Sequence, residues 1–517
     1  MAMSKPSAAF ANRRMPHALR LALPPAVLLF ASVTTAAAQG RAHLSNDLQR
    51  HLDAGDGSAA SVIVSGTQEQ VAALASRHGL RIARALASGA VLEVPANKLD
   101  ELASDAEVPH LSGDLPTHGA MAVTDTAIGA DQAWQGAIGS GSDGANSRQA
   151  NGAGVTGKGI GVAILDSGVA LVPELRGQVS VRVDMLDRRG DGNDVWGHGT
   201  HLAGIIAGAG AVEANARGVA PGAHIVSVKV LGTDGAGRIS DLIEGIDWVI
   251  ANRKRYQIDV INLSLGAAVE QSWRDDPVCQ AIERAWRVNI VTVAAAGNFG
   301  KDANGNEVLG GVTSPGNCPY AITAGAVNTK GTPFRSDDVI TTYSSRGPTL
   351  IDGLLKPDLL APGNKVRSLL APNAVIAQQY PEKVVGAGAD ARLELSGTSM
   401  SSAVVAGAAA LLLEATTANP ESIRALLQLG AERLPELGIV QQGAGSLNVL
   451  ASLAIAAAKN ANVETSIAGE SIATGGTAFT AKAIEDDHLV WGDHLVWGDH
   501  LVWGDHLVWG DHLVWGD

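Results

Sequence analysis

The stretch 394–414 limits the folds open to this chain more than any other part of it. It reads ELSGTSMSSAVVAGAAALLLE, a long run of small and apolar residues with few β-branched side chains. The run is longer than a strand, so it predicts a buried helix. Ser399 follows Gly397 and Thr398 and stands at the expected N-terminus of that helix.

Two upstream stretches carry residues that could act with this serine. Residues 158–169, KGIGVAILDSGV, predict a buried central strand with Asp166 at its C-terminal end. Residues 194–208, DVWGHGTHLAGIIAG, place His198 between two glycines at the start of a second helix of small residues. A serine hydroxyl is a poor nucleophile at neutral pH and needs a base in contact and a carboxylate behind that base. Asp166, His198 and Ser399 are therefore candidate catalytic residues.

Taken singly, each candidate has a common structural explanation. A serine before an apolar helix is more often an N-cap than a nucleophile, and a single histidine is more often structural. Here, however, the motifs DSGV, GHGTHLAG and SGTSM occur together and in this order, and they resemble those of the subtilisin-like serine peptidases (subtilases). The resemblance implies that Ser399 is the nucleophile, His198 the general base and Asp166 its orienting carboxylate. It also implies that the chemistry requires no cofactor.

The fold expected for residues 120–458 follows from apolar strands that alternate with helices of small residues. The expected strands include 223–231, 259–265, 289–295 and 321–327, and a helix is expected over 277–287. This alternation predicts an α/β fold, a doubly wound and mostly parallel sheet with helices on both faces. Each block resembles its subtilase counterpart, so the resemblance covers nearly all of this peptidase domain.

The resemblance also indicates which residues stabilise the oxyanion of the reaction and which residues bind the substrate. It assigns the oxyanion hole to the Asn298 carboxamide and the Ser399 N–H, although an Asn after Gly is also a common turn residue. It assigns two edge segments to pairing with an extended peptide, where glycine allows close approach: Gly235, Ala236 and Gly237, and Ser264, Leu265 and Gly266. The primary specificity pocket is expected to be lined by residues 294–298 and Gly266, and to accept a medium to large uncharged side chain.

Two features depart from the family pattern. After Met400 the family continues with Ala, any residue, Pro and His, whereas this chain has Ser401, Ser402, Ala403 and Val404, which puts the local helix geometry in doubt. In the loop 204–218, where many subtilases hold calcium, the oxygen-bearing side chains are Glu213 and Asn215. Because calcium prefers six to eight oxygen ligands, the sequence leaves a structural calcium ion open.

The N-terminal region predicts export and maturation. Residues 1–38 have the pattern of a signal peptide, with a basic start, an apolar core too short to span a membrane and an A-x-A site before Gln39. They predict an extracellular, periplasmic or cell-surface protein. Within the N-terminal region 39–119, residues 61–116 predict the order strand, helix, strand, strand, helix, strand, a small ferredoxin-like α+β unit. This unit resembles a subtilase propeptide, which implies a folding assistant and inhibitor that is removed; an ordinary accessory domain is the alternative.

Charge and cysteine content exclude several functional classes. The net charge of −14, without a basic cluster beyond the leader, argues against nucleic acid as a partner. The chain has two cysteines, Cys279 and Cys318, too few for a disulfide-dense scaffold or a multi-cysteine zinc site. In an exported protein these two could form a disulfide or remain two separate buried thiols, and the sequence does not decide between them.

The C-terminal region differs in composition from the rest. Residues 459–486 are expected to be a mobile linker rich in small residues. Residues 487–517 hold five copies of DHLVWG, which allow continuous strands or short strands with Gly-Asp turns. Three interpretations remain open: attachment or carbohydrate binding through tryptophans, metal binding through the five repeat histidines (His488, His494, His500, His506 and His512), or a repeat expansion without selected function.

Together these observations predict a secreted serine endopeptidase, activated by propeptide removal, whose substrates are proteins or peptides. A processing protease with narrow targets is a rival within the same class. The rival outside the enzymes is a catalytically silent binding protein whose tail is the working part. The oligomeric state cannot be read from the sequence.

Overall fold

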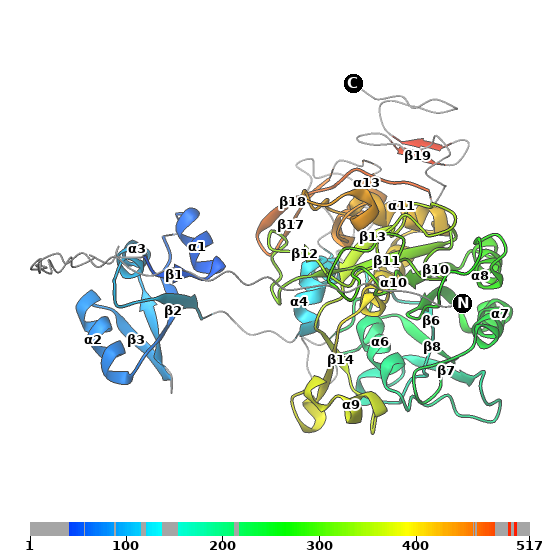
Figure 1. Cartoon of the computed structure of the whole chain (residues 1–517), viewed down its shortest axis with the longest axis horizontal. Coiled ribbons are helices and arrows are strands. Elements are labelled where there is room, and N and C mark those ends of the chain that lie inside the picture. Colours follow the sequence, from blue (N-terminus) through cyan, green and yellow to red (C-terminus); the bar gives the residue numbers. More distant parts are fainter. Residues whose placement is uncertain are drawn as a thin grey trace, which may run out of the picture. The chain divides into compact units, whose positions relative to one another are not determined.

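The computed structural model describes residues 41–55, 57–86, 89–114, 120–136, 154–210, 217–458, 460, 463–480, 495–497 and 501–503. The chain divides into two compact units, residues 1–117 and 118–517 (Figure 1). The predicted signal peptide, Glu213, Asn215 and most of the hexapeptide repeats lie outside the described residues.

The first unit contains a five-stranded sheet with three helices. Its sheet has the order β1-β5-β2-β4-β3. The strands are β1 (His43–Leu44), β2 (Ala60–Ser65), β3 (Arg81–Leu86), β4 (Gly89–Val94) and β5 (His110–Gly113), and the helices are α1 (Asn46–Asp53), α2 (Gln68–His78) and α3 (Ala96–Ala103). From β2 to β5 the elements follow the predicted ferredoxin-like order. Strand β1 and helix α1 precede the predicted elements and were not expected from the sequence.

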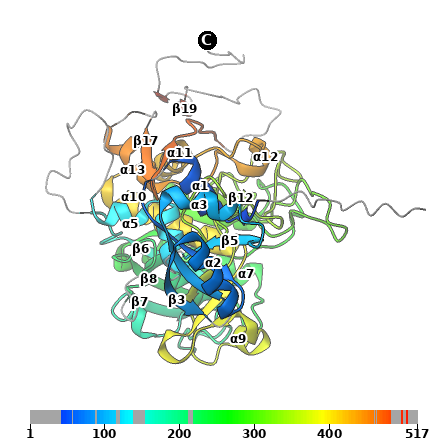
Figure 2. The same cartoon turned by 90° about the vertical axis from the view of Figure 1, so that its left-hand side faces the viewer.

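One face of this sheet forms the core of the first unit. Val62 and Val64 of β2 pack with Leu74 of α2 and with Leu99 and Leu102 of α3, while β3 is largely exposed. Figure 2 shows the helices α1, α2 and α3 of this unit with the strands β3 and β5. The first unit therefore has its own hydrophobic core and the size of a small independent domain.

The second unit is built on an eight-stranded sheet. The strand order is β12-β11-β10-β9-β6-β8-β7, with β13 also pairing with β11, and every pair is parallel except β11 with β12. The strands are β6 (Gly161–Asp166), β7 (Val179–Asp184), β8 (His224–Lys229), β9 (Ile258–Leu263), β10 (Val291–Ala295), β11 (Ala321–Asn328), β12 (Val339–Ile340) and β13 (Leu359–Pro362). Asp166 ends the central strand β6, as predicted.

Helices cover both faces of this sheet, which confirms the predicted doubly wound α/β class. Helices α6 (His198–Ala207) and α10 (Thr398–Ala415) lie on one face, and α7 (Ile239–Tyr256) and α8 (Pro277–Arg287) on the other (Figure 1). Alternate residues of β6 enter the two layers: Val162 and Ile164 face one core, and Ala163 and Leu165 face the other. A strand buried on both faces explains the continuous apolar run in the sequence.

Helix α10 is the buried helix that the stretch 394–414 predicts. It runs unbroken through Ala403 and Val404, both fully buried, so the loss of the family proline and histidine leaves the helix regular. Ser401 is accommodated by donating its hydroxyl proton to the Ala361 carbonyl (3.0 Å). Within the described residues α10 is long and apolar enough to cross a membrane, but 78% of it is buried inside the unit, as expected for a core helix.

The remaining elements of the second unit surround this framework. They are α4 (Ala120–Ala127), α5 (Ala130–Trp134), α9 (Val375–Gln379), α11 (Pro420–Gly430), α12 (Ile439–Gln442), α13 (Val449–Ala458), the small sheet of β14 (Val366–Leu369), β16 (Arg392–Leu395) and β15 (Val384–Val385), and three short 3-10 turns (Pro173–Leu175, Pro381–Lys383 and Gly388–Asp390).

The expectation of a mobile linker over residues 459–486 is wrong for residues 463–480. These residues form the hairpin β17 (Glu464–Ile467) and β18 (Glu470–Ala473) and a following segment that packs on the rest of the second unit. Ile467, Ile472 and Phe479 are buried. The composition of small residues did not indicate this structure, because three apolar side chains are enough to anchor the hairpin and the segment after it. In the repeat region, β19 (Leu495–Trp497) and β20 (Leu501–Trp503) pair antiparallel.

Candidate active site

Asp166 and His198 are brought together by the end of β6 and the start of α6. His198 Nδ1 lies 2.8 Å from Asp166 Oδ1, and the carboxylate is completely buried. The main-chain N–H of Ser167 donates to the same oxygen (2.8 Å). This contact fixes the tautomer of the imidazole, because Nδ1 holds a proton toward Asp166 and Nε2 is left to act as a base.

A second buried carboxylate, Asp194, organises the turn before His198. Its Oδ1 accepts from the Gly197 N–H (2.7 Å) and the Ser167 hydroxyl (2.9 Å), and its Oδ2 accepts from the N–H and hydroxyl of Thr200 (2.8 and 2.6 Å). Gly197 has φ of 104°, a left-handed conformation that glycine adopts readily. Asp194 therefore fixes the main chain on both sides of His198 in the first turn of α6.

The electrostatics of this pair favour a protonated imidazole. Burial alone would lower the pKa of His198, but attraction to Asp166, the hydrogen bond to Asp166 and the charge of Asp194 outweigh it, so the pKa of His198 is raised above 6.5. One turn later, burial lowers the pKa of His201 to about 3. His201 stays neutral and donates Nε2–H toward the Leu393 carbonyl (2.9 Å), a structural role.

Ser399 occupies the first turn of α10, where main-chain N–H groups have no partner within the helix. In this structure its hydroxyl donates to the carbonyl of Ser264 (3.1 Å) and not to His198. Below it, the hydroxyls of Ser264 and Ser402 both donate to the Ser399 carbonyl (2.9 Å each). Ser402, one of the departures from the family pattern, thus helps to anchor the turn that carries Ser399.

Asn298 follows strand β10 and is positioned by Thr398. Its Oδ1 accepts from the N–H (3.0 Å) and the hydroxyl (3.2 Å) of Thr398, and the Thr398 hydroxyl is also 3.0 Å from the Gly297 N–H. With its oxygen occupied in this way, Asn298 presents Nδ2 as a donor. The position of a Cβ on Gly397 would be 3.4 Å from this nitrogen, so the amide lies against the start of α10.

A cavity of about 440 Å³ opens beside this site, although Asp166 and Asn298 are not among its lining residues. His198 and Ser399 both line it, together with all six residues of the two expected substrate segments, Gly235, Ala236, Gly237, Ser264, Leu265 and Gly266. The rest of its wall comes from Trp196, Val230, Leu231, Arg238, Ile239, Leu242, Ala267, Val278, Ser314 and Pro315. A concave site with a nucleophile, a base and free donors can perform acyl transfer.

Comparison with known proteins agrees with this geometry. The model of the subtilase family matches residues 157–461, more than half of the chain. The chain belongs to the subtilase family. Members of this family are serine-type endopeptidases, and they need no cofactor for catalysis.

Individual relatives differ in how much of the chain they match. Serine protease AprX of Bacillus subtilis is 37% identical over 305 residues, which cover 58% of this subtilase and 67% of AprX. Subtilisin E of Bacillus subtilis is 35% identical over 263 residues, 50% of this chain and 57% of its own length. An extracellular serine proteinase of a Thermus species is 30% identical over 367 residues, 70% of this chain and 76% of its own. A solved structure described as the S41 psychrophilic protease matches with a TM-score of 0.47 and 28% identity, over 57% of this chain and 92% of that one.

The lining of the cavity at Ser399 differs in detail from the lining expected for the specificity pocket. Ala294, Ala295 and Ala296 are buried and do not line the cavity. Gly266 lines the cavity as expected, and Ala267, Val278, Ser314 and Pro315 form the wall beside it. Thr313 lies between Gly266 and Gly297, since a Cβ on either glycine would come within 3.0 Å of its side chain. Nothing in the sequence pointed to Val278, which lies 121 positions before Ser399.

No group of three or more His, Cys, Asp or Glu side chains that could hold a metal ion occurs among the described residues. A further cavity of about 460 Å³ lies beside α4 and contains no residue of the proposed catalytic set. It is lined by polar and basic side chains, including Lys330, Lys365 and Arg367, the last of which pairs with Glu394 (2.8 Å).

Proposed function

We propose that this subtilase is a secreted serine endopeptidase that hydrolyses peptide bonds in extended protein substrates. The observation that carries the proposal is the 2.8 Å contact between His198 Nδ1 and the buried Asp166 carboxylate, at a cavity that also holds Ser399. A buried carboxylate against a histidine, in a cavity that also holds a serine hydroxyl, supplies the groups that peptide hydrolysis by serine requires.

In the proposed reaction, Ser399 Oγ attacks the carbonyl carbon of the scissile bond while His198 Nε2 takes the hydroxyl proton. Asp166 stabilises the imidazolium that forms. The oxyanion is held by Asn298 Nδ2 and the Ser399 N–H, donors that are already oriented before the reaction. His198 then returns the proton to the leaving amine, and water hydrolyses the acyl-enzyme by the same steps in reverse.

The substrate is proposed to bind as an added strand between the segments 235–237 and 264–266. Both segments line the same cavity as Ser399, and main-chain pairing suits substrates of varied sequence. A panel of unrelated denatured proteins separates a broad endopeptidase, which cuts many of them, from a processing enzyme with narrow targets, which cuts few.

The first unit is proposed to be a propeptide that assists folding, inhibits the enzyme and is removed. Its support is a compact unit with its own core and the ferredoxin-like order of elements.

Secretion is supported by the Cys279–Cys318 disulfide, since such bonds persist in oxidising compartments. The C-terminal repeats are proposed to serve surface attachment or assembly, which is supported by the pairing of two copies. Removal of residues 481–517 should then release cell-bound enzyme without loss of activity.

Intact mass and N-terminal sequence of the purified full-length protein, beside Ser399→Ala prepared identically, test the catalytic proposal. Self-processing predicts that the wild type begins near residues 115–125 and that Ser399→Ala keeps the N-terminal unit. The wild type should also be labelled by a fluorophosphonate at Ser399. If both proteins keep the unit and no label is found, a binding protein replaces the endopeptidase as the preferred function.

A further inference from the structure

We propose that the Cys279–Cys318 disulfide and the Asp276 carboxylate together set the shape of the pocket wall, and thereby the preference for the substrate side chain that enters it. The proposal rests on the proposed function, because it concerns the same substrate cavity. Neither cysteine nor Asp276 lines that cavity, so all three are positioning residues that act through their neighbours.

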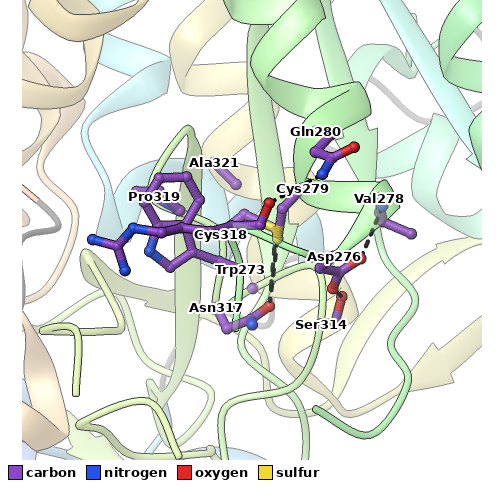
Figure 3. The surroundings of a disulfide bond; sticks show 12 residues. Trp273, Asp276, Val278, Cys279, Gln280, Ser314, Asn317, Cys318, Pro319 and Ala321 are labelled. Carbon is purple, nitrogen blue, oxygen red and sulfur yellow. Dashed lines mark hydrogen bonds between the residues drawn. A yellow bond between two sulfur atoms is a disulfide. The ribbon is translucent and has the colours of Figure 1, made fainter. Parts of the chain in front are cut away.

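The disulfide joins two segments that lie 39 positions apart in the sequence. Cys279 is in the first turn of α8, and Cys318 is in the loop that leads into β11 (Figure 3). Their Cα atoms are 5.3 Å apart, and both side chains are buried, 1% and 0% exposed. The Asn317 amide oxygen lies 4.0 and 3.9 Å from the two sulfur atoms; since a disulfide has no S–H to donate, this is a packing contact.

Asp276 makes a second, parallel connection between the same two segments. As the N-cap of α8, it accepts with Oδ1 from the Val278 N–H (2.8 Å). Its Oδ2 accepts from the hydroxyl of Ser314 (2.7 Å), four residues before Cys318 (Figure 3). The carboxylate is only 8% exposed, so little water competes for these bonds.

The disulfide and the hydrogen bonds of Asp276 fix the positions of the residues that form the cavity wall. Val278, Ser314 and Pro315 line the cavity that contains Ser399. The main chain of Ser314 pairs in both directions with Ala267, with N–H to carbonyl distances of 2.8 and 3.0 Å. The wall is therefore continuous from the substrate segment 264–266, through Ser314, to the first turn of α8.

The outer side of the same loop is packed independently of the two connections. Tyr320 makes edge-to-face contacts with Trp273 and Trp286, with ring centroids 5.9 and 5.8 Å apart, and the Arg424 guanidinium lies over Trp286 at 4.9 Å. This aromatic cluster keeps the loop folded when a connection is lost. We therefore expect the wall to shift while the domain remains folded, which changes selectivity more than it changes the chemistry at Ser399.

The expected effect is a loss of discrimination between substrates. A hydrophobic pocket distinguishes side chains that differ by one methylene by about 10- to 200-fold, and that discrimination depends on a fixed wall. We compare peptides that are identical except for Leu or Val at the residue that enters the pocket. The ratio of their kcat/KM values should fall about 3- to 10-fold when the wall loosens, a partial loss of the discrimination that such a pocket provides.

The experiment uses mature enzyme obtained from the full-length chain. The variants are the Cys279→Ala, Cys318→Ala pair, Asp276→Ala and Asp276→Asn. Asn keeps an acceptor for the Val278 N–H and a polar group for Ser314, so it is the conservative rescue. Glu470→Gln in the distant β17–β18 hairpin, where Glu470 accepts from Ser336, is the matched control for lost stability. Each protein is assayed for the selectivity ratio, fluorophosphonate labelling rate and Tm.

Support requires that the ratio falls in the cysteine pair variant and in Asp276→Ala, while Asp276→Asn and Glu470→Gln keep the wild-type ratio. A wild-type ratio in Asp276→Ala, whatever its Tm, overturns the proposal and leaves the two connections with a role in stability alone. If the cysteine pair variant does not fold, Asp276→Ala decides, because its disulfide is intact. A wild type that is neither active nor labelled would instead refute the endopeptidase proposal, and the inference with it.

Discussion

Thr398 fixes the orientation of the Asn298 carboxamide by donating hydrogen bonds to the carboxamide oxygen. Two donors of one residue, the N–H at 3.0 Å and the hydroxyl at 3.2 Å, meet the same Oδ1 atom. Because Thr398 is also the first residue of α10, the helix that carries Ser399 orients both proposed oxyanion donors. A single rigid element therefore sets the geometry in which the oxyanion would be stabilised.

The first prediction concerns these donors. Asn298→Ala should lower kcat by about a hundred- to a thousandfold with little change in KM, the loss known for an oxyanion donor of subtilisin. Thr398→Val should lower kcat by about tenfold, the value of one hydrogen bond of roughly 1.4 kcal/mol. Steady-state kinetics on one peptide substrate, with Thr398→Ser as the control that keeps the hydroxyl, measure both. Equal kcat in Thr398→Val and the wild type would show that Thr398 does not orient the amide.

The second prediction is the pH dependence of the reaction. His198 acts as a base only when neutral, so kcat/KM should fall as the pH drops through its pKa. Attraction to Asp166 and the charge of Asp194 raise this pKa above 6.5 despite burial. The acidic limb of the profile should therefore have its midpoint above pH 6.5. Asp194→Asn removes one negative charge and should move the midpoint to lower pH; an unmoved midpoint would contradict the assigned contribution of Asp194.

The third prediction concerns Lys356, which is completely buried beside the start of β11. Its ammonium donates to Asp358 Oδ2 (2.6 Å) and to the Ala321 carbonyl (2.7 Å), while Arg424 lies 3.7 Å from the other oxygen of Asp358. Lys356→Met should lower the free energy of unfolding by about 3–5 kcal/mol, the usual cost of breaking a buried ion pair. Urea denaturation in the Ser399→Ala background, where self-digestion is removed, measures it. A loss below about 1 kcal/mol would mean that Arg424 alone satisfies Asp358.

The same lysine predicts how stability changes in alkaline solution. Burial lowers the pKa of Lys356 to about 8, against 10.5 in the unfolded chain. Between these pH values the unfolded chain binds more protons than the folded chain, so the contribution of Lys356 to stability rises with pH, by at most about 3 kcal/mol. When the pH rises through this window, the Ser399→Ala protein should gain stability relative to the same protein that also carries Lys356→Met. Parallel curves for the two proteins would refute the lowered pKa.

The sequence predicted those features of the fold that arise from local periodicity. The apolar run before Asp166 identified β6 because a strand buried on both faces admits no polar residue. Helix α8 was predicted with its observed bounds, Pro277–Arg287, since Asp276 and Pro277 form a clear helix start. The order of elements in the first unit was equally readable.

Other features depend on contacts between distant segments and could not be predicted. Nothing near Thr398 in the sequence indicates that it binds Asn298, a hundred positions away, and the pairing of Ser314 with Asp276 is of the same kind. The hairpin at 464–473 was missed because its composition suits a linker, and only the packing of Ile467 and Ile472 distinguishes the two.

The last prediction tests whether this hairpin and the segment after it belong to the folded peptidase domain. Phe479 is 7% exposed and packs with Leu355, Ala431 and Ala444, and its N–H donates to Gln428 Oε1 (3.1 Å). Phe479→Ala should therefore lower the free energy of unfolding by about 3–5 kcal/mol. Ser399→Ala proteins that end at residue 480 or at residue 461 extend the test. The first should keep the Tm of the full chain, and the second should melt several degrees lower. Equal Tm values for both truncations would mean that residues 463–480 pack on the domain without stabilising it.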